Sequence, residues 1–415
     1  MVRLPQQTVA LKEATMPIPT SQLKTWGNVQ WQTKMKHVAP SKGGAVGVMF
    51  VWCANPSSSG PNYANPGSAD FVIKPSMGSA ATTKFAEKLL DKAIGAQSVN
   101  TVPVMRADPR FSAILAALQR FRTAADNTVH QMGMNATPPQ RDLQARWASV
   151  WPSYQNASAL MVQDLALGMA EFDEVQHDPL QGGLAQLLAN RQLMVNLGRL
   201  FAADAILGNG DRLCSLNTTN ILFKKTTAQI LSVDSQAILV SYQALLQQGS
   251  ATATQWVNQI ITRNAGAQAP ETSQHAVLAP SFALQDLYDV ERWWRVMFRG
   301  QLERSTQRHG EAQPGEAIWA FARGNFMQGV EEGLRAVDSQ LSGINWMLLK
   351  SKFKSYEKRY GASPNMDWTN LKIRRMYVKM VLADRNKPGT ADEKQQRAFD
   401  KVVSYATRKV GGNVV

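Results

Sequence analysis

The sequence predicts an α+β protein of two lobes, the second of them mostly helical. Short apolar runs rich in β-branched and aromatic residues are concentrated before residue 165. From Leu180 onward apolar residues recur mainly at helical spacing, and one small hairpin, over 220–233, interrupts this pattern. At 415 residues the chain is long enough for two or three domains, or for one large two-lobed domain.

The first half of the chain is expected to be a polar leader followed by a strand-rich lobe. Residues 1–42 are polar and contain four prolines, which predicts a partly flexible leader with little regular structure except a short segment near Trp26 to Trp31. Strands are expected at 46–52 and 71–75, joined as a hairpin by a loop dense in Pro, Ser, Gly and Asn. The elements expected next are helices over 82–94 and 109–131, strands over 100–105 and 160–165, and an irregular stretch over 151–158.

The second half is expected to be helical on both sides of the 220–233 hairpin. We therefore assign 43–165 to an N-terminal lobe and its connection, and 166–280 to a C-terminal lobe. A helical region over 281–415 would complete or extend that lobe. Core packing is the expected role of most tryptophans of this last region. These are Trp293, Trp294, Trp319, Trp346 and Trp368.

The positive charge of the chain is concentrated near its C-terminus. The net charge is +14, and the residues from 350 onward hold 16 Lys and Arg against 6 Asp and Glu, a net +10. This region would favour an acidic protein partner or an anionic membrane, and the alternative is a solvated helical face. The chain has no helix-turn-helix or zinc-finger pattern, so sequence-specific binding of nucleic acid is not expected.

The cysteines and histidines show no familiar pattern. Cys53 and Cys214 are expected to be ordinary thiols, which favours a reducing compartment. No two of the five histidines have zinc-site spacing. No run has the length of a membrane helix, and the leader has no apolar core of signal-peptide length. We therefore expect a soluble intracellular protein.

The segment 208–234 combines acidic and amide side chains at a spacing typical of phosphotransferases. Such an enzyme needs a carboxylate that orients and deprotonates the attacking hydroxyl, and further oxygen ligands that hold magnesium on the phosphates of ATP. Asp211 follows a Gly-Asn-Gly turn and is expected to be the base. Asn220 precedes one expected strand and Asp234 ends the next, so both are expected to bind Mg²⁺ or Mn²⁺.

Three neighbouring residues are expected to support this segment. Asp204 lies on the preceding helix and would orient the loop. Arg212 would pair either with Asp204 or with a substrate phosphate. Asn217 begins the asparagine pair that ends at Asn220.

The expected nucleotide contacts come from the first lobe. Lys74, at the end of a short strand, would contact the α- and β-phosphates, and Glu87 is the candidate carboxylate that holds it. Backbone amides of a glycine-rich stretch could approach phosphate, although it is not a Walker A motif. These glycines are Gly43, Gly44 and Gly47.

The connection between the lobes would contact adenine through its backbone. Its residues are Gln163, Asp164 and Leu165. Each of these nucleotide contacts has a plain structural alternative: a surface lysine, a solvent-facing helix charge, glycines of a tight turn, and a core strand.

These segments, in this order, resemble the catalytic domain of the actin-fragmin kinase family of atypical protein kinases. The resemblance spans about half of the chain, from residue 43 to residue 240. Its segments are FVIKPS (71–76), FAEKL (85–89), VPVMR (102–106), LMVQD (160–164), ILGNGDR (206–212) and VDSQAI (233–238). It implies a two-lobed protein-kinase-like fold and transfer of the γ-phosphate of Mg-ATP to Ser or Thr of a protein such as actin. The same resemblance implies Asp211 as base, Lys74 as phosphate contact, and Asn220 and Asp234 as metal ligands.

The resemblance leaves several alternatives open. The acidic residue that it predicts after the lysine falls near Lys84, one turn before Glu87. Related machinery in phosphoinositide kinases and secretory-pathway kinases leaves a lipid acceptor open. A pseudokinase or adaptor, or a nucleotidyl or glutamyl transferase, is also compatible with the sequence. The polar leader is typical of bacterial effectors injected into host cytoplasm without a cleavable signal peptide.

Overall fold

A computed structural model shows that the chain is an α+β protein. It divides into two compact units, one formed by residues 1–78 and 99–167, the other by 79–98 and 168–415. The residues described are 19–41, 47–53, 69–76, 80–94, 97–165, 169–178, 180, 182–207, 209, 212–213, 218–232, 289–342, 346–360, 375, 378–384, 386–390, 393–394 and 397.

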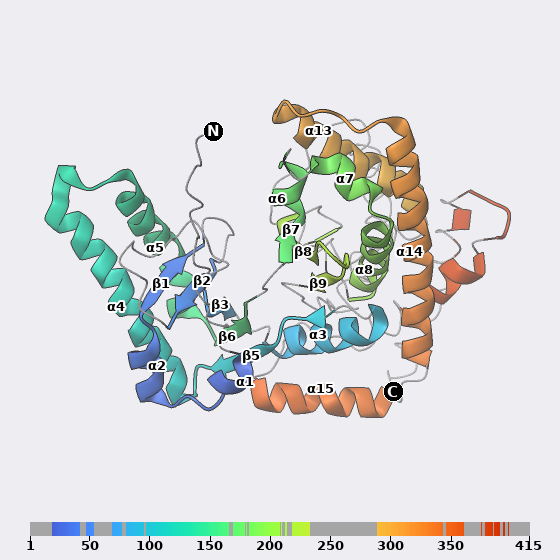
Figure 1. The fold of residues 1–415 in the computed structure, drawn as a ribbon. Coiled ribbons are helices and arrows are strands. Elements are labelled where there is room, and N and C mark those ends of the chain that lie inside the picture. Colours follow the sequence, from blue (N-terminus) through green and yellow to red (C-terminus); the bar gives the residue numbers. More distant parts are fainter. Residues whose placement is uncertain are drawn as a thin grey trace, which may run out of the picture. The chain divides into compact units, whose positions relative to one another are not determined.

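The first unit is an antiparallel sheet covered by helices (Figure 1). In spatial order its strands are β1 (His37–Pro40), β2 (Met49–Trp52), β3 (Phe71–Ser76), β6 (Ala159–Asp164) and β5 (Thr101–Met105). Its helices are α1 (Thr20–Leu23), α2 (Asn28–Lys34), α4 (Pro109–Met132), the 3₁₀ turn η2 (Gly133–Asn135) and α5 (Pro138–Asn156). The predicted β2–β3 hairpin is therefore confirmed.

The stretch 19–41 differs from the expected leader. It forms α1, α2 and β1, and it places Leu23, Trp26 and Trp31 in the core of the first unit. Trp26 and Trp31 each meet Phe71 of β3 edge to face, at ring centroid distances of 6.0 and 5.8 Å. The short segment expected near Trp26 to Trp31 corresponds in part to α2, whereas α1 and β1 were not predicted, because the polar residues around them give no clear apolar pattern.

The expected irregular stretch over 151–158 is largely wrong. Helix α5 continues through Pro152 to Asn156, because its apolar side is fixed by tertiary contacts. Trp151 and Tyr154 are buried, and the Tyr154 hydroxyl donates a 2.6 Å hydrogen bond to the carbonyl of Ile73 on β3. Packing of this kind outweighs the unfavourable helix propensity of proline.

The second unit combines a small sheet with most of the helices. Its elements up to the hairpin are α3 (Ala80–Ile94), β4 (Gln97–Ser98), β7 (Met169–Glu171), α6 (Phe172–Gln176), α7 (Gly183–Ala189), α8 (Arg191–Leu207), η4 (Thr218–Asn220), β8 (Ile221–Lys224) and β9 (Ile230–Ser232). The later ones are α12 (Val290–Trp293), the π-helical turn η5 (Trp294–Arg299), α13 (Gly300–Arg308), α14 (Glu316–Ser342) and α15 (Trp346–Tyr360). The sheet order is β4-β9-β8-β7, and only β4 joins in parallel.

Helix α3 belongs by its contacts to the second unit, whereas the sequence analysis grouped residues 80–94 with the first lobe. The helices after residue 289 belong to the same unit as α8. Within the described part of the chain, no helix is both long enough and apolar enough to cross a membrane.

Helices α8 and α14 pack with their backbones in contact (Figure 1). A Cβ atom on Gly198 would lie 2.1 Å from the carbonyl oxygen of Phe326, and one on Gly329 would lie 2.0 Å from that of Val195. Beside this contact, Trp293 stacks on Phe326 at a centroid distance of 5.5 Å. Burial confirms the core role of Trp293, Trp294 and Trp319.

Candidate functional site

The β8–β9 hairpin positions the first of the predicted metal ligands. Asn220 ends η4 directly before β8. The antiparallel register pairs Ile221 with Ser232, so Asn220 stands at the end of the hairpin from which the chain continues to Asp234. Five predicted site residues lie outside the described residues. These are Gly43, Gly44, Asp211, Asn217 and Asp234.

An ion pair joins the two sides of the segment that holds Asp211. Asp204, in the last turn of α8, and Arg212, just after that segment, are both fully buried. The Nε atom of Arg212 donates to Oδ2 of Asp204 over 3.0 Å, and a second guanidinium nitrogen bonds Oδ1. The first of the two partners expected for Arg212 is therefore the one observed. Its complete burial argues against contact with a substrate phosphate.

A backbone hydrogen bond at the end of helix α8 also holds Asn209, two residues before Asp211. The backbone N–H of Asn209 donates to the carbonyl of Asp204 over 3.0 Å, and Asn209 is fully buried. Nearly every residue of α8 from Leu193 to Leu207 is buried, so this helix is a rigid support rather than a surface element. The Gly-Asn-Gly sequence thus follows one of the most enclosed helices of the unit.

Lys74 lies on the face of the first unit's sheet that is turned away from α4 and α5. Ile73 and Val162 point into the core with these helices. Since side chains alternate along a strand, Lys74 belongs to the opposite face, where Met161 is its direct neighbour on β6. Lys74 is half-buried. A cation on such a rigid strand is what a nucleotide phosphate contact requires.

Most of the backbone groups that were predicted to contact adenine already form hydrogen bonds within the sheet. Strand β6 lies between β3 and β5, so its backbone groups bond to strands on both sides. The backbone N–H of Asp164 donates to the carbonyl of Asn100 over 3.1 Å. The side chain of Gln163 is also engaged, since its Nε2 donates to Oγ1 of Thr101 over 3.1 Å. Leu165 is the first residue beyond the strand.

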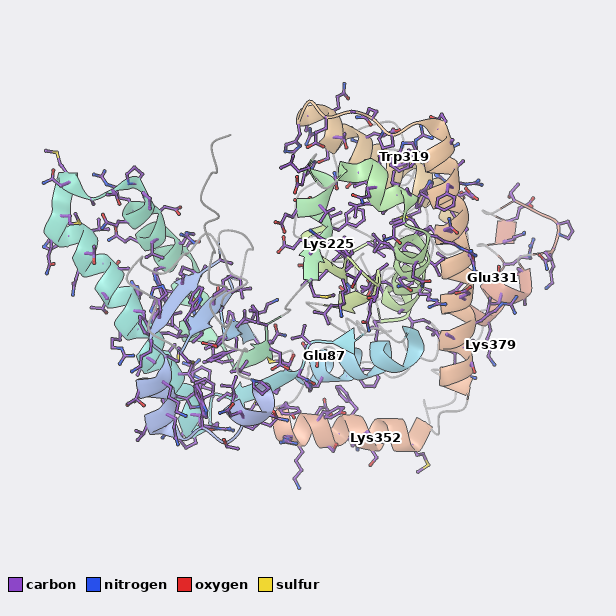
Figure 2. All side chains as sticks on the ribbon, viewed as in Figure 1. Glu87, Lys225, Trp319, Glu331, Lys352 and Lys379 are labelled. Carbon is purple, nitrogen blue, oxygen red and sulfur yellow. The ribbon has the colours of Figure 1, made fainter. Side chains whose placement is uncertain are left out.

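Two other predicted nucleotide contacts have structural explanations. Gly47 has φ +73, and a Cβ atom there would lie 2.3 Å from Cγ1 of Val150 on α5. Close packing and backbone conformation therefore explain this glycine without a phosphate. Glu87 on α3 (Figure 2) is buried and accepts a 2.6 Å hydrogen bond from Nζ of Lys84, one turn earlier on the helix.

A polar cavity of about 380 Å³ lies where α6, η4 and α13 meet. The Oγ1 atom of Thr218, at its wall, donates to Oδ1 of Asp173 over 2.8 Å. Arg304 and Arg308 also line the cavity. Gln176 beside them is 1% exposed, and its amide has no hydrogen-bond partner among the described residues. Two guanidinium groups and an amide suit an anionic ligand, although the carboxylate of Asp173 also lines the cavity.

Sequence reasoning missed this cavity because its residues come from three separate segments and form no motif. The comparisons with known proteins add no assignment: no family model matches the chain, and no curated protein matches it.

Proposed function

We propose that the chain is an ATP-dependent phosphotransferase of protein-kinase-like fold that transfers the γ-phosphate of Mg-ATP to a serine or threonine of a protein. The observation that carries the proposal is the β8–β9 hairpin, which begins after Asn220 and ends two residues before Asp234. An amide oxygen directly before the hairpin and a carboxylate two positions after it in the sequence suit magnesium.

The proposed roles follow the chemistry of each side chain. Asp211 accepts the proton of the attacking hydroxyl, and Asn220 and Asp234 hold Mg²⁺ on the phosphates. Lys74 contacts the phosphates from its strand. The buried pair of Asp204 and Arg212 supports the segment that contains Asp211. The acceptor in this proposal is a host protein such as actin, reached by a bacterial effector.

The test is phosphate transfer from radiolabelled Mg-ATP into purified actin and into a eukaryotic cell extract. Asp211→Asn, which removes the charge but keeps the shape, is expected to lower labelling about 10²–10⁴-fold. Asp142→Asn is the matched control, since Asp142 is an exposed carboxylate on α5. Equal labelling by wild type and Asp211→Asn would contradict the proposal.

Further measurements distinguish a protein kinase from a lipid kinase, a pseudokinase and a nucleotidyl or glutamyl transferase. Labelling of phosphoinositide vesicles but of no protein would assign a lipid acceptor instead. Binding of ATP without any turnover would assign a pseudokinase. Intact mass of a modified acceptor distinguishes phosphate from AMP or glutamate.

A further inference from the structure

Three metal-ligating side chains meet in the second unit, where the residue after α6 contacts α13 and the residues that follow it (Figure 1). His177 directly follows α6, while His309 and Glu311 follow α13. One ligand atom from each lies within 4.8 Å of the other two. We propose that these three side chains bind a single divalent transition-metal ion, with zinc as the best match.

The hydrogen bond of His309 fixes which of its two nitrogens can face the ion. The Nδ1 atom of His309 lies 2.9 Å from the carbonyl oxygen of Ser305, which can only accept. Nδ1 therefore carries the proton, and the lone pair of His309 is on Nε2. A backbone carbonyl that receives the second ring N–H is the usual support of a metal-bound histidine.

His177 has the same kind of support. Its Nε2 atom lies 3.1 Å from Oγ of Ser305, and its Nδ1 atom lies 2.9 Å from Oε1 of Glu311. In this structure the Nδ1 atom of His177 is positioned to donate its proton to the carboxylate of Glu311. A bound ion would displace that proton, and with Nε2 then donating to the hydroxyl of Ser305, Nδ1 and the carboxylate would both face the ion. Ser305 thus orients both histidines, one through its side chain and one through its carbonyl.

The nitrogen and carboxylate ligands of this site favour zinc over magnesium. Two imidazoles and one carboxylate are a set that zinc uses with a fourth, open position, whereas magnesium prefers oxygen ligands alone. The ring centroids of His177 and His309 are 4.0 Å apart and the ring planes are tilted by 38°, so the exposed ring of His309 has to turn before both in-plane lone pairs meet at one ion.

The order Ser305, His177, Glu311 also resembles a nucleophile, base and acid. A hydrolytic role is disfavoured because Ser305 lies inside helix α13, where its own backbone N–H belongs to the helix and cannot stabilise an oxyanion. A triad also gives no role to His309, whereas the metal site uses it as a ligand.

The ion would join two parts of the unit that are far apart in sequence. His177 and Glu311 are separated by 134 positions. Because the unfolded chain does not hold these ligands together, zinc binding stabilises the folded unit. This consequence does not depend on phosphotransfer, so it can be tested separately.

The experiment uses the full-length chain without an affinity tag, treated with EDTA and then titrated with zinc against a fluorescent chelator. We expect about one zinc ion per chain, and His309→Ala is expected to weaken binding at least ~100-fold. His309 is exposed, so this variant should fold normally. His130→Ala is the matched control, because it removes another exposed histidine, on α4 in the first unit.

A second measurement follows thermal unfolding with and without zinc. Zinc should raise the unfolding midpoint of wild type, His130→Ala and Asp211→Asn, and should leave His309→Ala and Glu311→Gln unchanged. Magnesium at the same concentration should not replace zinc in the titration. Absence of zinc binding by wild type, or equal binding by wild type and His309→Ala, would overturn the proposal.

Discussion

Asp204 and Arg212 form an ion pair in which neither side chain is exposed to solvent. The pair links the last turn of α8 to Arg212, which follows the Gly-Asn-Gly sequence and Asp211 in the chain. A buried charge is tolerated only while its partner is present, because desolvation of a lone ion is costly. The support of the proposed catalytic segment is therefore also a point where one substitution can unfold the unit.

Breaking this pair is expected to destabilise the protein strongly. Arg212→Met leaves the Asp204 carboxylate buried without its counter-charge and should lower the free energy of unfolding by about 3–5 kcal/mol. Chemical denaturation measures the change. Glu291→Gln breaks the exposed pair with Arg323 and should cost less than about 1 kcal/mol. A similar loss of unfolding free energy in the two variants would contradict the claim that burial makes the Asp204–Arg212 pair the more important one.

The contact between α8 and α14 predicts that replacing glycine by alanine on α14 lowers stability at Gly329 and raises it at Gly324. Gly329→Ala places a methyl group against the backbone of Val195, which cannot move aside as a side chain can. The expected cost is about 3 kcal/mol or more. Gly324→Ala on the same helix meets no atom within 4 Å and should stabilise it by up to ~1 kcal/mol. Thermal unfolding of the two variants gives the sign of each effect.

His37 is expected to make the protein less stable in mild acid. Burial lowers the pKa of His37 to about 4 from its usual 6.5, so the folded state keeps the ring neutral while the unfolded chain takes up a proton. The contribution of the neutral His37 ring to the free energy of unfolding is complete above pH 6.5, and it is lost as the pH falls toward 4. The loss is expected to reach about 2–3 kcal/mol.

The control for this prediction is His37→Phe, which keeps an aromatic ring beside Trp52 and Phe121. Burial raises the pKa of Asp70 and of Glu171, and these carboxyls favour the folded state as the pH falls. The difference between wild type and variant therefore isolates His37. Parallel stability curves between pH 4 and 6.5 would contradict the assignment.

The elements with a strong local pattern were predictable from sequence. The short apolar runs before Lys74 and after Asn220 predicted their strands, because runs of β-branched and aromatic residues of this length favour strands. The contribution of Trp26 to the core was not predictable, since its partner Phe71 is distant in sequence. The meeting of His177 with Glu311 depends in the same way on tertiary packing, which no local spacing reveals.

Lys74 allows a direct test of where nucleotide binds. If Lys74 contacts the phosphates, Lys74→Ala removes a charge-assisted hydrogen bond worth about 1.5–3 kcal/mol and should weaken Mg-ATP binding ~10–100-fold. Calorimetric titration with a non-hydrolysable ATP analogue measures this without turnover. Lys24→Ala is the matched control, because Lys24 is an exposed lysine of the same unit. Equal affinities of the two variants, with unchanged circular dichroism, would show that the nucleotide does not use this face of the sheet.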